Sequence, residues 1–303
     1  MTLKLKEKII ITGGSGHIAS ALGALLEQLG KYDVHYLSRN KRTEKDYIWD
    51  PEIRYIDPKA IPGTTHLIHL AGTSIADKRW TKSVKKEIIT SRVNTANWLY
   101  QLIEEQHIPL KTFISASAIG YYGGCRREDI VNEDTPAYND FMGTVCEQWE
   151  AAANQFLKLN SRVVTVRIGV VLFKQGGALH KMAQTSRWGF VPIGDGKQPI
   201  SWIHLHDLCA IFKESLLNTH MQGAYNAVSP HFVDNQTLTQ ALAKQLNKPY
   251  WNIGIPAFLL RIILGERAIL VTNGVIVEPK RLIENVFKFK YAHINDALAN
   301  IYS

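Results

Sequence analysis

The 303-residue sequence is poor in cysteine and holds no paired-cysteine motif. Its three cysteines, Cys125, Cys146 and Cys209, lie far apart, and none belongs to a C-x-x-C pattern. An odd number of cysteines cannot all pair within one chain, and isolated thiols do not form a zinc or iron–sulfur site. The sequence therefore predicts no metal site and a reducing compartment.

Long apolar stretches are also missing. The first apolar run, which begins at Ile9, is interrupted by glycines after three residues, too few for a signal-peptide core or a membrane span. The carboxyl-terminal end carries no anchor motif. We therefore expect a cytoplasmic protein without a membrane partner.

Charge of one sign is not concentrated anywhere in the chain. The net charge is +8, yet the densest basic runs are only pairs, such as those at residues 85–86 and 126–127. A nucleic-acid-binding protein more often gathers its positive charge on one stripe interleaved with aromatic residues. We expect no nucleic-acid partner, and we interpret the excess charge as a mild preference for anionic small molecules.

What the sequence does contain is an alternation of short apolar runs with helical patterns. Apolar runs at residues 8–12, 34–37, 66–70, 112–117 and 162–168 predict buried strands. Helical spacing follows the first run as far as a C-terminal cap at Gly30, and recurs at residues 82–105 and 143–157. This order predicts an α/β fold, a Rossmann-like doubly wound parallel sheet.

The pattern changes after Gly169, where glycines, prolines and aromatic residues become frequent and the elements shorter. We predict a Rossmann-like domain over residues 1–245, with segments of a smaller substrate lobe after residue 170. Residues 246–303 are predicted to form a small C-terminal domain.

A glycine-rich turn at residues 12–19 gives the strongest local signal. It follows a strand directly and opens a helix, which is the context that dinucleotide binding requires. Gly13 permits the tight turn, and Gly16 lets the backbone approach a pyrophosphate at the helix N-terminus. Ala19 occupies the third glycine position and is small enough for close packing. A plain turn is the alternative interpretation.

The end of the second strand predicts which dinucleotide binds. An acidic residue there would bind a ribose 2′-hydroxyl, but the sequence has Ser38, Arg39 and Asn40 instead, with Lys41 and Arg42 beyond. A guanidinium can bind a phosphate through two hydrogen bonds. NADP(H) is therefore favoured over NAD(H), unless this segment is simply a solvated basic loop.

Several motifs together resemble one family. They are LAGTSIADKRWT (70–81), SRVNT (91–95), SASAIGYYG (115–123), CEQWEAAA (146–153), RIGVVL (167–172) and SWIHLHDL (201–208). With the glycine turn, they resemble the extended short-chain dehydrogenase/reductase or NAD-dependent epimerase/dehydratase superfamily. Within it, they resemble the "epimerase family protein" branch, which has its own C-terminal domain.

The resemblance implies a set of cofactor contacts. Gly13, Gly14, Ser15, Gly16, His17 and Ile18 would meet the pyrophosphate, and Ser38 and Arg39 the 2′-phosphate. Leu70, Ala71 and Gly72 would pack beside the adenosine half. Arg92 would reach a phosphate or ribose with Glu87 beside it, and Val171 would line the nicotinamide end. The alternative for Glu87 and Arg92 is a pair of exposed helix charges.

The catalytic positions depart from the superfamily. Its members usually combine a Ser or Thr with a Tyr-x-x-x-Lys pair, whose lysine lowers the pKa of the phenol. Ser117 matches the Ser, but Met142 and Cys146 occupy the Tyr and Lys positions. Tyr121 and Tyr122 are the remaining phenolic candidates, and packing is the alternative role for both. Cys146 is more typical of a small core residue than of a reactive thiol.

Alternation in residues 202–207 predicts that Trp202, His204 and His206 share a face. Such a histidine pair can bind a metal, but structural histidines are favoured, and Asp207 is expected to cap the following helix.

The sequence supports two hypotheses for the function of the protein. The leading hypothesis is NADP-dependent oxidoreductase or epimerase chemistry on a small, polar, sugar-like substrate. The alternative is a non-catalytic NADP(H)-binding protein with a regulatory or structural role. The resemblance also implies a homodimer through the helices at residues 82–105 and 143–157.

Overall fold

The computed structural model describes the chain except for residues 1–5, 125–128 and 186–188. Its centre is an eight-stranded sheet in the order β12-β8-β6-β5-β1-β2-β3-β4, parallel throughout except for β3 with β4. The strands are β1 (Glu7–Thr12), β2 (Tyr32–Ser38), β3 (Asp46–Asp50), β4 (Tyr55–Ile56), β5 (Thr64–His69), β6 (Thr112–Ala118), β8 (Arg162–Ile168) and β12 (Gly223–Ala227). The predicted fold class is confirmed.

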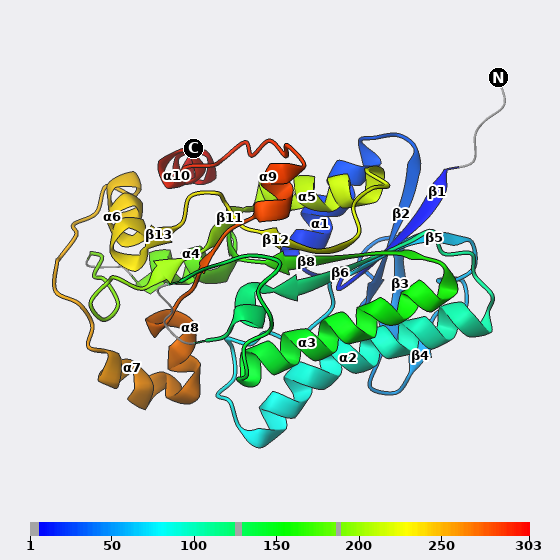
Figure 1. Ribbon diagram of the computed structural model, residues 1–303, viewed down its shortest axis with the longest axis horizontal. Coiled ribbons are helices and arrows are strands. Elements are labelled where there is room, and N and C mark those ends of the chain that lie inside the picture. Colours follow the sequence, from blue (N-terminus) through cyan, green and yellow to red (C-terminus); the bar gives the residue numbers. More distant parts are fainter. Residues whose placement is uncertain (1–5, 125–128, 186–188) are drawn as a thin grey trace.

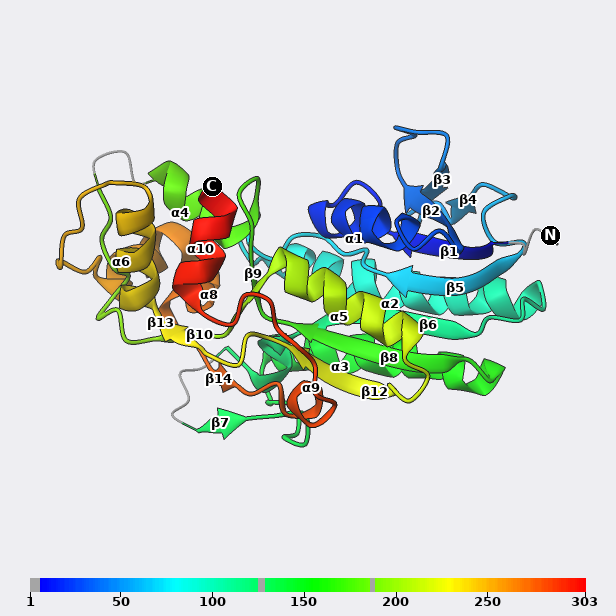
Figure 2. The same cartoon turned by 90° about the horizontal axis from the view of Figure 1, so that it is seen from above.

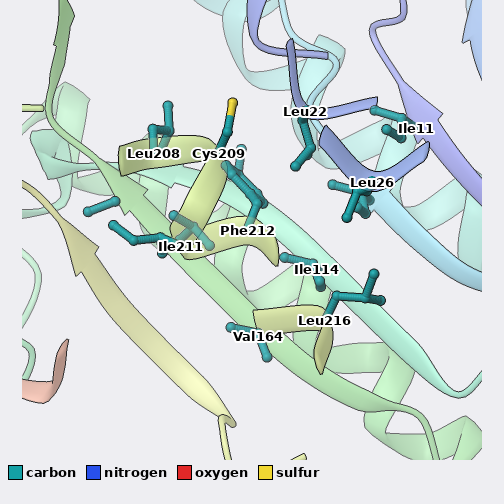
Figure 3. Packing of buried hydrophobic residues seen from close by; sticks show 14 of the residues in the cluster. Ile11, Leu22, Leu26, Ile114, Val164, Leu208, Cys209, Ile211, Phe212 and Leu216 are labelled. Atoms are coloured by element: carbon teal, nitrogen blue, oxygen red, sulfur yellow. The ribbon is translucent and has the colours of Figure 1, made fainter. Parts of the chain in front are cut away.

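Helices cover both faces of the sheet (Figure 1). One face carries α1 (His17–Glu27) and α5 (Leu205–Leu217), and the other carries α2 (Lys82–Glu105) and α3 (Phe141–Asn154). Figure 3 shows the packing on the first face, where Leu22 and Leu26 of α1 and Phe212 of α5 meet apolar side chains of the sheet. The sheet is thus buried on both faces by two separate apolar layers, as is usual for parallel sheets.

Two helix ends differ from the sequence prediction. α3 starts two residues early because the Asp140 carboxylate accepts a hydrogen bond from the backbone N–H of Gly143 at 2.8 Å, an N-cap. It ends at Asn154 and continues as the 3₁₀ helix η2 (Gln155–Leu159). Gly30 is not the C-cap of α1. The helix ends at Glu27, and Gly30 lies in the following turn with φ +72°.

Shorter elements form a lobe beyond the carboxyl ends of β6 and β8 (Figure 2). Its strand pairs are β9 (Val170–Leu172) with β11 (Trp202–His204), β10 (Pro199–Ile200) with β13 (Val233–Asp234), and β7 (Ile130–Val131) with β14 (Ile276–Val277). The remaining helices are η1 (Ile119–Tyr122), α4 (Gly177–Thr185), α6 (Asn235–Gln245), α7 (Ala257–Leu264), η3 (Gly265–Ala268), α8 (Ile269–Thr272), α9 (Lys280–Glu284) and α10 (Ile294–Tyr302). Among the described residues, no helix is both long and apolar enough to cross a bilayer.

The C-terminal segment shares its cores with the rest of the chain. Leu238 and Leu242 of α6 pack with Leu298 of α10 in one cluster. Phe287 and Phe289 pack against the main core, on the face of the sheet that carries α1 and α5. Apolar clusters thus cross residue 245, and the division into residues 1–245 and 246–303 stays a prediction.

Candidate cofactor and active site

The glycine turn joins the end of β1 to the start of α1. Gly13 adopts φ +70°, and a Cβ there would come within 3.2 Å of the Ala71 backbone, so the turn packs directly on the end of β5. Gly16 is the N-cap of α1 in an extended conformation, with no side chain capping the helix. A Cβ on Gly16 would meet only the Gly13 carbonyl oxygen, at 3.2 Å. The N-terminus of α1 is therefore open to solvent, and its uncapped N–H groups can donate to an anion.

Thr12 fixes the distance between this turn and β5. Its Oγ1 accepts hydrogen bonds from the backbone N–H groups of Leu70 and Ala71, both at 3.0 Å, and lies 2.9 Å from His69 Nδ1. Burial lowers the pKa of His69 to about 4, so the ring is neutral and accepts the hydroxyl proton of Thr12. Thr12 was not among the predicted site residues, because its partners lie more than 55 residues away in the sequence.

Of the two arginines that follow β2, only Arg42 contacts the glycine turn. Arg39 is exposed. Arg42 Nη2 donates to the carbonyl oxygen of Gly14 at 2.5 Å and to the buried Asp46 carboxylate at 3.3 Å. The Ser38 hydroxyl donates to the Asn40 carbonyl at 2.6 Å. One guanidinium is thus anchored at the glycine turn while the other is free to reach a ligand, an arrangement that suits a 2′-phosphate.

Arg92 and Glu87, predicted to lie side by side, are not in contact. Arg92 Nη2 donates to the Thr73 carbonyl at 2.9 Å, and its Cζ lies 3.0 Å from the Cβ position of Gly72. Burial lowers the pKa of this guanidinium. Glu87 instead accepts from Lys78 at 3.0 and 3.1 Å. Arg92 therefore lines the predicted cradle, and Glu87 forms an exposed ion pair outside it.

The other predicted cofactor residues gather around the start of α1. His17 is exposed, and its ring centroid lies 5.1 Å from that of Phe173, which follows β9. Ser15 is exposed in the turn, whereas Ile18 packs against the main core. Val171 lies in β9 and packs against the same core. The loop after β9 consequently folds beside the start of α1.

Ser117 belongs to a buried chain of polar groups. Its hydroxyl donates to Glu150 Oε1 at 2.8 Å, and Arg167 binds both oxygens of the same carboxylate at 2.8 Å. Arg167 Nη1 donates to the Tyr122 hydroxyl at 2.9 Å, which donates in turn to Asn226 Oδ1 at 2.7 Å. Because the Ser117 proton is directed to Glu150, the oxygen lone pairs of Ser117 are what it can offer a ligand. Glu150 and Asn226 were not predicted.

The two phenols have different surroundings. Tyr122 is fully buried, and burial raises its pKa to about 12. Tyr121 is half-buried, with the Arg167 Cζ 3.5 Å from its ring centroid. A neutral, buried phenol is a poor general base, so the geometry leaves Tyr121 as the more accessible of the two.

Met142 and Cys146 lie one turn apart on α3 and face Gly120. A Cβ on Gly120 would lie 2.8 Å from the methyl carbon of Met142 and 3.7 Å from Cys146 Sγ. Burial raises the pKa of Cys146 to about 12. An un-ionised thiol and a thioether hold the positions where the superfamily has Lys and Tyr, and neither accepts a proton at neutral pH.

The histidine and aspartate predictions after β11 need correction. α5 begins at Leu205, so strand alternation stops before His206. His204 caps the helix, with Nδ1 accepting from the His206 N–H at 3.0 Å. Asp207 does not cap α5, because it accepts instead from the backbone N–H groups of Lys290 and Tyr291 at 3.0 and 2.9 Å. Within the described residues, no cluster of three or more potential metal ligands occurs.

Comparisons with known families agree with this arrangement. The model of the NAD dependent epimerase/dehydratase family matches residues 9–227, and a domain of unknown function, DUF1731, matches residues 255–301. The chain is 37% identical to the chloroplastic "Epimerase family protein SDR39U1 homolog" of Arabidopsis thaliana, over 97% of this chain and 86% of the relative. It is 32% identical to "Epimerase family protein SDR39U1" of Mus musculus, over 97% and 99%.

Solved structures extend the comparison. Human epimerase family protein SDR39U1 (isoform 2), crystallised with NADPH, superposes with a TM-score of 0.87 at 30% identity, over 97% of this chain and 99% of that one. A nucleoside-diphosphate sugar epimerase from Corynebacterium glutamicum gives 0.80 at 30% identity, over 98% and 58%. The chain therefore belongs to the NAD-dependent epimerase/dehydratase family and has the short-chain dehydrogenase/reductase fold.

Proposed function

We propose that this protein binds NADP(H) across the carboxyl ends of β1, β2 and β5. The pyrophosphate meets the N-terminus of α1 at Gly16, where no side chain caps the helix. Arg39 and Arg42 face the 2′-phosphate, and the backbone at Leu70 and Ala71 borders the adenosine half. When bound, the nicotinamide supplies a hydride acceptor or donor. The human relative crystallised with NADPH supports this choice.

The substrate we propose is small, polar and sugar-like, and the reaction is oxidoreductase or epimerase chemistry. Support comes from the Corynebacterium relative, named a nucleoside-diphosphate sugar epimerase. Ser117 accepts a hydrogen bond from a substrate hydroxyl, since its own proton is directed to Glu150. Tyr121 borders the proposed substrate site beside Arg167. Tyr122 does not contact the substrate but helps to position Arg167, from which its hydroxyl accepts a hydrogen bond.

A specific observation keeps a second function under consideration. Met142 and Cys146 remove the usual proton acceptor, and a protein that only binds NADP(H) would need none.

The homodimer through α2 and α3 and the cytoplasmic location stay predictions.

The observation that carries the proposal is the 2.5 Å hydrogen bond from Arg42 to Gly14, which places a guanidinium at the glycine turn. Titration calorimetry with NADPH tests the binding step, and an absence of heat at millimolar cofactor would overturn it. Incubation of the NADP⁺-loaded protein with UDP-glucose and UDP-glucuronic acid then separates the two functions. Formation of NADPH or of an epimer supports catalysis.

A further inference from the structure

Helix α7 is an apolar helix, one side of which is left uncovered by the described part of the chain. Seven of its eight residues are apolar, and none of its side chains is buried. Together with the segment before it, α7 exposes six large apolar side chains, called here the apolar end: Trp251 (53%), Ile253 (76%), Phe258 (62%), Leu259 (41%), Ile262 (69%) and Ile263 (70%). Figure 1 shows α7 at the outer end of the lobe, away from the sheet. A cluster of this kind marks an interaction surface.

The exposed apolar side chains of α7 form a stripe, while Ala257, Leu260 and Leu264 on the opposite side are partly buried. At 100° per residue, Phe258, Leu259, Ile262 and Ile263 fall on one side of the helix. Arg261 borders the stripe and is exposed. The helix therefore presents an apolar face with a cation at its edge.

Further cations surround the same end of the molecule. Arg79 lies against the end of α7, with its Nε 2.9 Å from the Cβ position of Gly265. An ion pair between Lys85 and Glu266 holds the start of α2 against η3. This pair brings two exposed lysines of α2 to the same region, and the exposed cations there, called here the basic rim, are Arg79, Lys82, Lys86 and Arg261.

The basic rim is not neutralised internally. In the described part of the chain, no carboxylate lies within ion-pair distance of any of its four members. The nearby acids are already engaged, since Asp77 pairs with Lys181, Glu87 with Lys78 and Glu266 with Lys85. The apolar end and the basic rim together therefore complement a partner that is apolar in its interior and negatively charged at its edge.

A second copy of the chain fits this requirement poorly. In a two-fold dimer the same patch faces itself, which would bring the basic rim of one copy against that of the other. Like charges across an interface oppose association. A short projecting helix with apolar residues on one side and cations beside them is instead the form that inserts into a lipid surface.

We propose that the apolar end and the basic rim dock the protein peripherally on an anionic phospholipid bilayer. The side chains of the stripe enter the boundary between headgroups and acyl chains, while the cations meet lipid phosphates. Eight residues rise only about 12 Å, so α7 cannot span the bilayer. This inference goes beyond the proposed function and departs from the expectation, drawn from the sequence, that no membrane is a partner.

Flotation of the full chain with vesicles of phosphatidylcholine, with and without phosphatidylglycerol, tests the proposal. We expect binding to the anionic vesicles that weakens as salt is raised. Ile262→Asp should reduce the bound fraction by roughly fivefold or more, because it places a charge in the inserted stripe. Ile53→Asp is the matched control, since Ile53 is 75% exposed and lies in the loop between β3 and β4.

Arg261→Gln separates the charge contribution from the apolar one. It should weaken binding to anionic vesicles while leaving the helix intact. The proposal is overturned if the wild-type chain does not float with anionic vesicles, or binds uncharged vesicles equally well. It is also overturned if Ile53→Asp and Ile262→Asp behave alike. Light scattering that shows a dimer dissociated by Ile262→Asp would assign the surface to self-association, and retention on an acidic protein alone would assign it to a protein partner.

Discussion

The Ser117 hydroxyl, at the end of β6, donates to the Glu150 carboxylate on α3 at 2.8 Å, and this bond determines what Ser117 can do. The same carboxylate is held by two hydrogen bonds from Arg167, whose side chain is almost fully buried. Burial alone would lower the pKa of Arg167, but Glu150 raises it above its ordinary value. The site is thus built on a buried ion pair.

Removing the carboxylate should therefore destabilise the fold. Glu150→Ala leaves the buried guanidinium of Arg167 without its partner, and we expect a loss of about 3–5 kcal/mol in the free energy of unfolding. Glu150→Gln keeps an acceptor and should lose less. The exposed Glu147 on the same helix provides the control, and Glu147→Ala should change stability little. Urea titration measures all three, and an equal loss for Glu147→Ala and Glu150→Ala would refute the role of the ion pair.

Cofactor preference should follow the two arginines after β2. We expect NADPH to bind at least tenfold more tightly than NADH, a difference of about 1.4 kcal/mol. Arg39→Ala should remove most of that difference and leave NADH affinity nearly unchanged. Arg42→Ala should weaken both cofactors, because Arg42 also holds the Gly14 carbonyl of the turn. Calorimetry on the wild type that gives equal affinities would show that neither arginine meets a 2′-phosphate.

Two glycines of the same turn should respond differently to substitution. Gly16→Val places a branched side chain where a pyrophosphate approaches, so cofactor binding should be lost while the fold persists, since φ at Gly16 is an ordinary −80°. Gly13→Ala forces a side chain into φ +70° against the Ala71 backbone and should cost about 1–3 kcal/mol of stability. Thermal unfolding and NADPH titration distinguish the two. Normal NADPH binding by Gly16→Val would mean that the turn is structural only.

The fold class and the strand-turn-helix unit at residues 7–27 could be predicted from the sequence, because each depends on residues that are adjacent in the chain. The β1-turn-α1 unit and the basic loop after β2 are contiguous in sequence. The hydrogen bonds of Thr12 to β5 and of Glu150 to Ser117 join residues 33 to 59 positions apart, and only the assembled sheet reveals them. The resemblance implies that Glu87 lies beside Arg92, but Lys78 from the preceding loop binds the Glu87 carboxylate instead.

Stability should depend on pH through His69. Burial lowers its pKa to about 4, against about 6.5 in the unfolded chain, so the unfolded state alone takes up a proton between these values. Stability is therefore retained above pH 6.5 and declines as the pH falls towards 4. This residue should account for about 2 kcal/mol of the loss between pH 7 and pH 5. Urea titrations of wild type and His69→Gln at both pH values measure it, and identical losses would contradict the assignment.

The last prediction concerns chemistry. Burial raises the pKa of both Cys146 and Tyr122 to about 12, so neither offers an ionised base at neutral pH. A general base typically contributes about 10²–10⁴-fold, and any hydride transfer should be slow by that factor. Ser117→Ala or Tyr121→Phe should reduce turnover without weakening NADPH binding, with NADPH absorbance following turnover on UDP-glucose or UDP-glucuronic acid.

Restoring the missing pair completes that test. Met142 and Cys146 already lie one turn apart and face Gly120, so Met142→Tyr with Cys146→Lys places a phenol and an amine in the superfamily's spacing. If the protein is an inefficient enzyme, the double variant should accelerate an existing rate. If it only binds NADP(H), the double variant should create activity where the wild type has none. Turnover that survives the combined loss of the hydroxyls of Ser117, Tyr121 and Tyr122 would show that the proton is transferred by another group.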